Sequence, residues 1–393
     1  MLAALRRLPP EVWALGLVSL LTDAASDMVY PLLPALLATV HGGALALGVL
    51  EGVAELLASF VKAWAGGAAD RRGGHGRFVI AGYGLATVAR PLLAVVTAPW
   101  QAVLFRAFDR LGKGLRSAPR DAILARVTPK EHRGLAFGLH RAMDNAGAVI
   151  GPLLATVLLV ALQLPLRAVI ALAIVPGLLS TAVAVYAVTR HRMSSTPAVA
   201  SPAEPLPAKA RVMLAAVALC ALGASADSFL LLRLAGLGLP LALAPVAWLS
   251  LQAGKMLLNV PGGVLADRLG PRRVLLASWL VYVVCYGAFA WAPSWPAFWA
   301  VFVAYAAHYG LGEGAEKSLL ARLTPETSRG RAFGAQHALH GLALLPANVL
   351  FGLLYARRPA LAFAASALFA AAGGLVLAFG TREADARLSG ATT

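Results

Sequence analysis

Long apolar segments recur along almost the whole chain. They lie near residues 12–38, 43–65, 78–97, 100–118, 133–162, 166–189, 211–238, 241–262, 274–292, 295–320, 331–355 and 359–380. Each is close to or above the roughly 20 residues that a helix needs to cross a bilayer. The pattern predicts an all-α membrane protein with 12 transmembrane helices.

The second half of the chain repeats the first. The stretch ILARVTPKEHRGLAFGLHRAM from Ile123 is matched 196 residues later by LLARLTPETSRGRAFGAQHAL from Leu319. A loop motif also returns at nearly the same shift, from Gly66-x-x-x-Asp70-Arg71-x-Gly73 to Gly263-x-x-x-Asp267-Arg268-x-Gly270. The repeat predicts two six-helix bundles, related by a pseudo-twofold axis along the membrane normal, with the substrate site between them.

The bundles are separated by a segment rich in proline and small polar residues, which indicates a solvated linker. We therefore assign residues 1–190 to an N-terminal bundle, 191–210 to a cytoplasmic linker and 211–393 to a C-terminal bundle. The segment MLAALRRLPPEVW leads directly into the first apolar run, so we expect no cleaved signal peptide.

Composition supports the membrane assignment. The 393 residues are 59% hydrophobic and 13% charged, whereas about a quarter of a soluble domain is charged. A net charge of +16 would suggest nucleic acid binding in a soluble protein. Here most lysines and arginines lie at one set of segment ends, and only Arg167, Arg357 and Arg358 lie at the other. This positive-inside bias places both termini and the linker in the cytoplasm, and we expect no nucleic acid partner.

The paired loop motif resembles the signature loop of the major facilitator superfamily. Gly147-x-x-x-Gly151-Pro152 is similar to the motif associated with proton antiporters of that superfamily. The resemblance covers the whole chain. It implies a secondary transporter of the prokaryotic proton-coupled efflux type in the inner membrane. It also implies a small-molecule or ion substrate, a monomer, and a proton gradient in place of a cofactor.

Ionisable residues inside a predicted span are functional candidates, because their burial in a membrane is costly unless they are paired or hydrated. In the N-terminal half they are Asp23 and Asp27 on the first segment, Glu51 and Glu55 on the second, and Arg141 and Asp144 on the fifth. The paired acids stand four residues apart and so share one helix face.

Five carboxylates against one arginine leave an excess of negative charge, which favours proton uptake by at least one of them. We therefore assign proton coupling to Asp23, Asp27, Glu51, Glu55 and Asp144, with Asp27, Glu55 and Asp144 as the strongest candidates. The alternative for any single residue is a closed salt-bridge network that fixes helix packing.

The fourth segment carries basic residues on one helix face, namely Arg106, Arg110, Lys113 and Arg120. Lys113 to Arg120 fit pairing with the acids and with lipid headgroups. Arg106 remains open between ion pairing and a cavity wall for an anionic substrate.

The C-terminal half offers a different set of polar residues. With Arg106 and Arg141, the predicted substrate cavity includes Asp227, Gln252, Lys255, His308, Glu313, Gln336, His337 and His340. A His/carboxylate set suggests a divalent metal. Buried histidines more often satisfy neighbouring carbonyl groups, and no HExxH motif occurs, so we assign no resident metal site.

The two signature loops have a mechanical interpretation. Their glycines allow sharp turns, and their aspartates and arginines can contact helix ends and lipid phosphates. We assign a cytoplasmic gate to Gly66, Asp70, Arg71, Gly73, Arg116, Gly263, Asp267, Arg268 and Gly270.

The preferred hypothesis is a proton-coupled exporter of a small organic or drug-like compound that works by alternating access. Two alternatives stay open: a divalent metal cation exporter, and a non-transporting receptor or scaffold on the same fold. An enzyme is the least favoured class, because the chain has no GxSxG, HExxH or paired-cysteine site.

Overall fold

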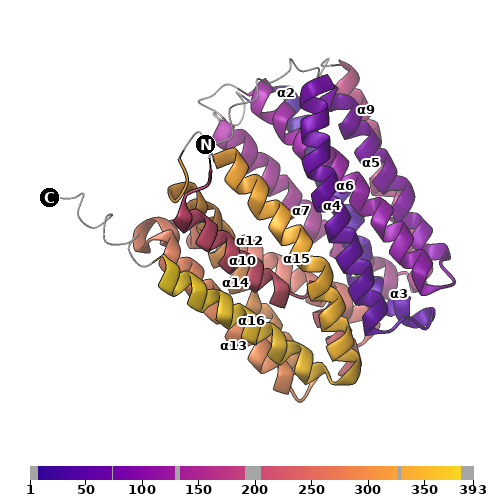
Figure 1. The fold of residues 1–393 in the computed structure, drawn as a ribbon. Helices are drawn as coiled ribbons and strands as arrows, with labels where there is room; N and C mark the ends of the chain where they lie inside the picture. Colours follow the sequence, from indigo (N-terminus) through magenta and orange to yellow (C-terminus); the bar gives the residue numbers. More distant parts are fainter. Residues whose placement is uncertain (1–7, 73, 129–132, 191–204, 326–328, 382–393) are drawn as a thin grey trace. The chain divides into compact units, whose positions relative to one another are not determined.

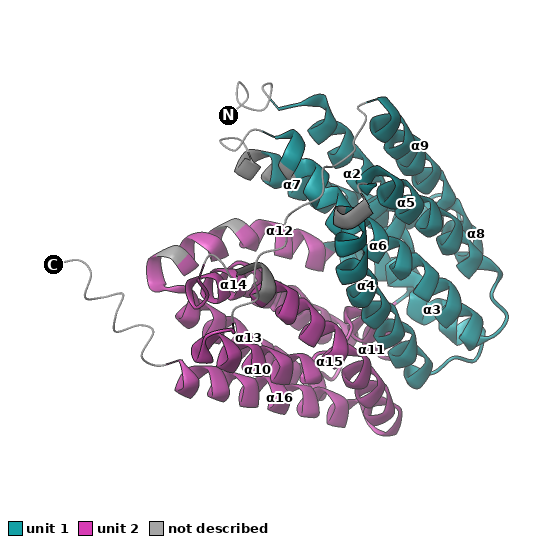
Figure 2. Cartoon of the chain, turned by 45° about the horizontal axis from the view of Figure 1, so that its top comes forward, with its two compact units in different colours: residues 1–199, 240–249 teal, residues 200–239, 250–393 magenta. Residues whose placement is uncertain are grey.

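The computed structural model describes residues 8–72, 74–128, 133–190, 205–325 and 329–381, and the regular structure in these ranges is entirely helical (Figure 1). The chain forms two compact units (Figure 2). Unit 1 contains residues 1–199 and 240–249, and unit 2 contains residues 200–239 and 250–393. Most of the predicted linker, residues 191–204, lies outside the described ranges.

Unit 1 is a helical bundle. Its elements are α2 (Pro10–Val29), η1 (Tyr30–Leu32), α3 (Leu33–Thr39), α4 (Ala44–Arg72), α5 (His75–Leu92), η2 (Leu93–Val95), α6 (Pro99–Val127), α7 (Arg133–Val160), α8 (Leu166–Leu172), α9 (Ile174–Arg190) and η4 (Leu241–Leu243). α6 continues well past the predicted end of its span at residue 118. The basic face predicted for this segment is therefore part of one long helix.

Unit 2 is a second helical bundle. Its elements are α10 (Ala208–Gly223), α11 (Asp227–Gly236), α12 (Ala244–Leu269, assigned to this unit from residue 250), α13 (Pro271–Trp291), α14 (Trp295–Arg322), α15 (Arg329–Arg357) and α16 (Pro359–Gly380). Gly270 precedes α13 with φ of +89°, a left-handed conformation that favours glycine. The second signature loop therefore turns at its last glycine.

The helices occupy the twelve predicted segments. Ten spans among the described residues are long and apolar enough to cross a membrane. The other two segments are α6 and α14. Both carry charged side chains along much of the half that is predicted to lie toward the cytoplasm. Their charges make them less apolar than the other helices.

Both units interrupt their first helix. In unit 1, α2 gives way to the short 3-10 helix η1, which contains Pro31, a residue without a backbone N–H. In unit 2, the helix stops at Gly223 and restarts at Asp227. Asp227 is therefore the first residue of the restarted helix α11.

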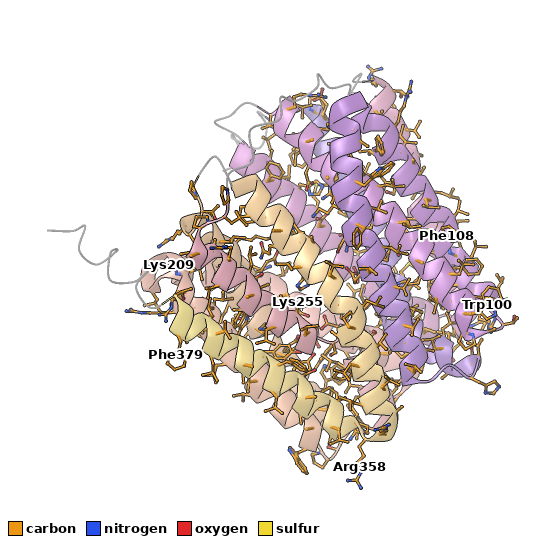
Figure 3. The ribbon with its side chains drawn as sticks, in the orientation of Figure 1. Trp100, Phe108, Lys209, Lys255, Arg358 and Phe379 are labelled. Carbon is orange, nitrogen blue, oxygen red and sulfur yellow. The ribbon has the colours of Figure 1, made fainter. Side chains whose placement is uncertain are left out.

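Each bundle has its own apolar core. In unit 1, Leu15, Val79 and Leu124 join buried residues from α2, α5 and α6. In unit 2, Met213, Leu275 and Leu319 do the same for α10, α13 and α14. Large apolar side chains also lie on the outer surface, including Trp100 and Phe379, which are 64% and 63% exposed (Figure 3). Such exposure is expected of helices that face lipid rather than water.

Candidate functional site

A buried network of four charged side chains links three helices of unit 1. Arg90 Nε on α5 lies 2.8 Å from Asp109 Oδ1 on α6. Arg106 Nη1 lies 3.2 Å from Asp109 Oδ2, and its Nη2 lies 3.7 Å from Glu51 Oε1 on α4. All four side chains are buried, and two positive charges balance two negative charges. Glu51 therefore has a countercharge beside it, and Arg106 is part of an ion-pair network.

Arg90 and Asp109 are the members of this network that sequence reasoning did not select as site residues. Arg90 is the only charged residue between Arg77 and the end of α5, and this isolation in an apolar helix was the available signal. Its Nη1 also donates to the carbonyl oxygen of Thr22 at 3.2 Å, which links α5 to α2.

A second carboxylate of α4 lies closer to the surface. Glu55 Oε1 is 3.7 Å from Arg110 Nε, and the Glu55 side chain is 33% exposed. Glu51 and Glu55 thus face two different arginines on α6. The charges of both acids and of Asp109 also act on Arg110.

Glycines of α7 allow α2 and α7 to approach each other closely. A Cβ added to Gly147 would overlap the carbonyl oxygen of Leu20, and one added to Gly151 would overlap the carbonyl oxygen of Ala24. The Gly147-x-x-x-Gly151 spacing therefore removes side chains where the two helices meet. Asp144, one turn before Gly147, is brought to the level of Asp23.

Acids gather at this contact. A Cβ added to Gly147 would lie 3.0 Å from Asp23 Cβ, and Asp144 stands one turn earlier on the same helix. The charges of Asp144 and Asp27 both act on Asp23. Arg116 and Lys113 on α6 are the cations that act on Asp23. The structure thus brings together Asp23, Asp27 and Asp144 out of the predicted acids.

Histidine and arginine adjoin Asp144. His140 Nδ1 lies 3.7 Å from Asp144 Oδ2, one helical turn away on α7. Within the described part of the chain, Asp144 Oδ1 and His140 Nε2 are buried without a hydrogen-bond partner. The charges of Arg120, Asp121 and Arg141 also act on His140. Buried polar atoms of this kind are rare unless a site uses them.

Basic side chains of α6 line one side of the acid cluster. Arg120 Nη1 donates to Ser19 Oγ at 3.0 Å, and Arg116 stacks on the Tyr83 ring with its Cζ 4.6 Å from the ring centre. Arg141, which was predicted to join the acids at mid-depth, is exposed.

Asp27 has a separate partner within unit 1. Trp248 Nε1 donates to Asp27 Oδ1 at 2.8 Å, and the Trp248 ring packs on Tyr30 with ring centres 4.6 Å apart. An indole N–H neutralises no charge, so this bond orients the carboxylate without pairing its negative charge.

An ion pair lies at the break between α10 and α11 in unit 2. Asp227 Oδ2 accepts a hydrogen bond of 3.0 Å from Lys255 Nζ, and Asp227 Oδ1 accepts one of 2.8 Å from the Tyr309 hydroxyl. Lys255 Nζ also lies 3.7 Å from the centre of the Tyr309 ring. Figure 3 labels Lys255 among the side chains of this unit. Tyr309 was not selected from the sequence, although it follows the selected His308.

The backbone at the break between α10 and α11 is held by side chains of other helices. The Ala226 N–H donates to Asn348 Oδ1 at 2.8 Å, and the Tyr282 hydroxyl donates to the Gly223 carbonyl at 3.2 Å. Ser225 Oγ and the Tyr286 hydroxyl are 2.8 Å apart. These bonds replace the helical hydrogen bonds that the break removes, and so they fix the position of Asp227.

The other polar residues predicted for this half have several partners of their own. His308 bonds to Ser278 of α13, Glu313 pairs with Lys317, and Gln336 donates to Glu316. Gln252 Oε1 is buried, and His337 and His340 are exposed on α15. No group of three or more His, Cys, Asp or Glu side chains suited to a metal ion occurs in the described ranges.

The repeat inverts charge at the fourth pair of equivalent helices. The shift of 196 residues relates Arg120 and Asp121 of α6 to Glu316 and Lys317 of α14. It also relates His140 and Asp144 of α7 to Gln336 and His340 of α15. The carboxylate that adjoins α2 in unit 1 therefore has no acidic counterpart in unit 2.

The signature loops are described only in part. Gly66 packs against Ala118 of α6, Gly263 belongs to α12, and Arg268 is exposed. Gly73 lies outside the described residues, as do the side chains of Asp70, Arg71 and Asp267. Pro152 lies within α7, and its carbonyl oxygen accepts a hydrogen bond from Thr156.

Known proteins are similar to this chain in sequence or in fold. An uncharacterized MFS-type transporter of Methanocaldococcus jannaschii is 30% identical over 386 residues, which span 95% of this chain and 96% of the relative. Multidrug resistance protein MdtH of Yersinia pestis is 32% identical over 116 residues, 30% of this chain and 29% of that protein. The solved peptide transporter POT has a TM-score of 0.79 at 13% identity, over 97% of this chain and 96% of the other.

The sequence profile of the Major Facilitator Superfamily matches residues 15–253 and 247–392, almost the entire chain. The predicted fold, an all-helical membrane transporter, is confirmed by this match and by the shared architecture of the solved transporter. The chain belongs to the Major Facilitator Superfamily of transporters.

Proposed function

We propose that this protein is a proton-coupled exporter of a small organic compound and that Asp23 and Asp144 share the coupled proton. One observation carries the proposal: Gly147 lets α7 approach α2 so closely that a Cβ added there would lie 3.0 Å from Asp23 Cβ, and Asp144 stands one turn away on α7. Two carboxylates held this close favour a state in which one proton is bound.

The groups around Asp23 and Asp144 are compatible with a proton shared between the two carboxylates. Asp27 shares the α2 face, and Arg116 and Lys113 approach from α6. His140 and Arg120 adjoin Asp144. Arg116 stacks on Tyr83 and Arg120 bonds to Ser19, so these arginines have other partners while the acids gain or lose a proton.

Glu51 and Glu55 have a different role in the proposal. Each faces an arginine of α6, so we assign Glu51 to helix packing and Glu55 to a secondary position beside Arg110. Asp27, oriented by Trp248, is the acid next in line to exchange a proton with the pair.

The direction of transport rests on two similarities. The Gly147-x-x-x-Gly151-Pro152 spacing is that of antiporters in the superfamily, and part of the chain is similar to MdtH, a multidrug resistance protein. Both favour export of a compound in exchange for protons. Transport would proceed by alternating access, with the two signature loops as cytoplasmic gates. We place the protein as a monomer in a prokaryotic inner membrane with both termini in the cytoplasm.

Everted membrane vesicles test this function. Vesicles with and without the protein are energised, their acid interior is followed by acridine orange quenching, and cationic ethidium, neutral chloramphenicol and anionic fluorescein are added in turn. Proton-coupled export predicts dequenching by at least one compound, only in vesicles that contain the protein. Binding of a compound without any flux would favour the receptor alternative. Zinc-evoked dequenching with no response to organic compounds would favour metal export.

A further inference from the structure

The surroundings of Lys255 Nζ have the chemistry of a cation site. On one side, Asp227 Oδ2 accepts its hydrogen bond at 3.0 Å. On another, the Tyr309 ring presents its face at 3.7 Å from the ring centre. A carboxylate oxygen and an aromatic face together form the arrangement that recognises organic ammonium groups.

We propose that Asp227 and Tyr309 form the binding site for the positively charged group of an organic cation substrate, and that Lys255 is a tethered cation which the substrate displaces. This inference rests on the proposed transport of a small organic compound and names its class.

The carboxylate and the lysine are attached to the unit in different ways. Asp227 begins α11, where the positive end of the helix dipole stabilises its charge. The preceding turn is held by Asn348 and Tyr282, and Tyr309 bonds to the other carboxylate oxygen. Lys255 reaches this point through a flexible four-carbon stem from α12. The acid therefore stands at the start of a helix, whereas the ammonium group stands at the end of a long side chain.

The two side chains of the Lys255–Asp227 ion pair differ in their exposure. The Lys255 side chain is 19% exposed and that of Asp227 is 9% exposed, so the lysine is the more exposed of the two. In this proposal, a cation that enters the site takes the place of the Lys255 ammonium group beside Asp227. An anionic ligand would instead have to compete with Asp227 itself for Lys255, directly beside a fixed negative charge.

Displacement of Lys255 also explains how the substrate can be released. When a substrate cation occupies the site, two positive charges compete for one carboxylate, and Lys255 can return as soon as the substrate leaves. An internal competitor lowers the apparent affinity by the fraction of time for which it fills the site. A transporter benefits from such weakened binding, because substrate must dissociate on the far side.

Equilibrium binding of radiolabelled tetraphenylphosphonium to the purified full-length protein in detergent tests the proposal. Lys255→Met should tighten binding about tenfold or more, because the competitor is gone. Lys317→Met, which removes a lysine from an exposed pair of the same unit, is the matched control and should leave the affinity unchanged. Asp227→Asn should abolish saturable binding. Tyr309→Leu should weaken binding more than Tyr309→Phe, which keeps the ring.

Two results would overturn the proposal. One is weaker tetraphenylphosphonium binding by Lys255→Met than by the wild-type protein, or no saturable binding by either. The other is saturable benzoate binding that Lys255→Met abolishes, because this would make the lysine an anion contact. Size-exclusion elution of each variant as a single symmetric peak separates a binding defect from misfolding. The assay needs no proton gradient, so it can fail or succeed independently of the vesicle measurements that test proton coupling.

Discussion

Arg90 Nε lies 2.8 Å from Asp109 Oδ1, and both side chains are almost fully buried in unit 1. Asp109 also faces Arg106, so one carboxylate compensates two arginines. Asp109→Asn should therefore lower the free energy of unfolding by about 3–5 kcal/mol, since breaking a buried pair leaves uncompensated charge behind. Thermal unfolding of the purified protein in detergent measures the loss.

Asp121→Asn is the matched control for this variant, because Asp121 lies on the same helix in a pair whose carboxylate side chain is 44% exposed. A change below about 1 kcal/mol is expected there. Equal unfolding temperatures for Asp109→Asn and Asp121→Asn would refute the structural role of the network.

Gly147 should tolerate no side chain. A methyl group at this position would overlap the Leu20 carbonyl and lie 3.0 Å from Asp23 Cβ. Gly147→Ala should destabilise the protein by about 1–3 kcal/mol, as overpacking does, and should reduce coupling because it separates Asp144 from Asp23. Gly287→Ala is the control, since its added Cβ would meet nothing within 4 Å. The α2–α7 contact would lose its assigned importance if both variants unfolded at the same temperature.

The Asn348 side-chain amide should stabilise the break between α10 and α11 in unit 2. Asn348→Leu removes the acceptor for the Ala226 N–H, and an unsatisfied buried donor costs about 1–3 kcal/mol. Because this bond helps to position Asp227, tetraphenylphosphonium affinity should fall together with stability. Asn259→Leu, at a half-buried position of α12, provides the comparison. Unchanged stability and affinity in Asn348→Leu would show that the break does not depend on this cap.

Histidines of α15 should be dispensable. His337 and His340 belong to no cluster of three metal-ligating side chains in the described ranges. The double variant His337→Ala/His340→Ala should show the same calorimetric response to zinc, nickel, cobalt and manganese as the wild-type protein, with no saturable site in either. A saturable site present only in the wild type would instead revive metal export.

Sequence reasoning found the fold because its signals are physical and local. Apolar segments long enough to cross a bilayer predict helices, and the repeated loop motif predicts the superfamily. The breaks in the first helix of each unit were not predicted. At Gly223–Asp227 the missing helical bonds are replaced by Tyr282 and Asn348, which are distant in sequence. Such replacement depends on tertiary contacts.

The candidate site was predicted less completely. The spacing of Asp23, Asp27 and Asp144 in apolar helices identified the three acids that the structure brings together. Glu51 and Glu55 share the same spacing, but their partners Arg106 and Arg110 lie on another helix. Helical periodicity places a residue on a face and does not reveal what that face meets. Arg90 and Tyr309 were missed for the same reason.

The most direct test of the account compares two activities of Asp23→Asn and Asp144→Asn in proteoliposomes, with Asp23→Glu as the conservative variant. The substrate is the compound that gives the largest dequenching in vesicles. Both Asn variants should lose pH-gradient-driven accumulation and retain exchange of labelled for unlabelled substrate at equal pH, while Asp23→Glu should keep part of both. Gradient-driven accumulation at the wild-type rate in both Asn variants would contradict proton sharing by these two aspartates.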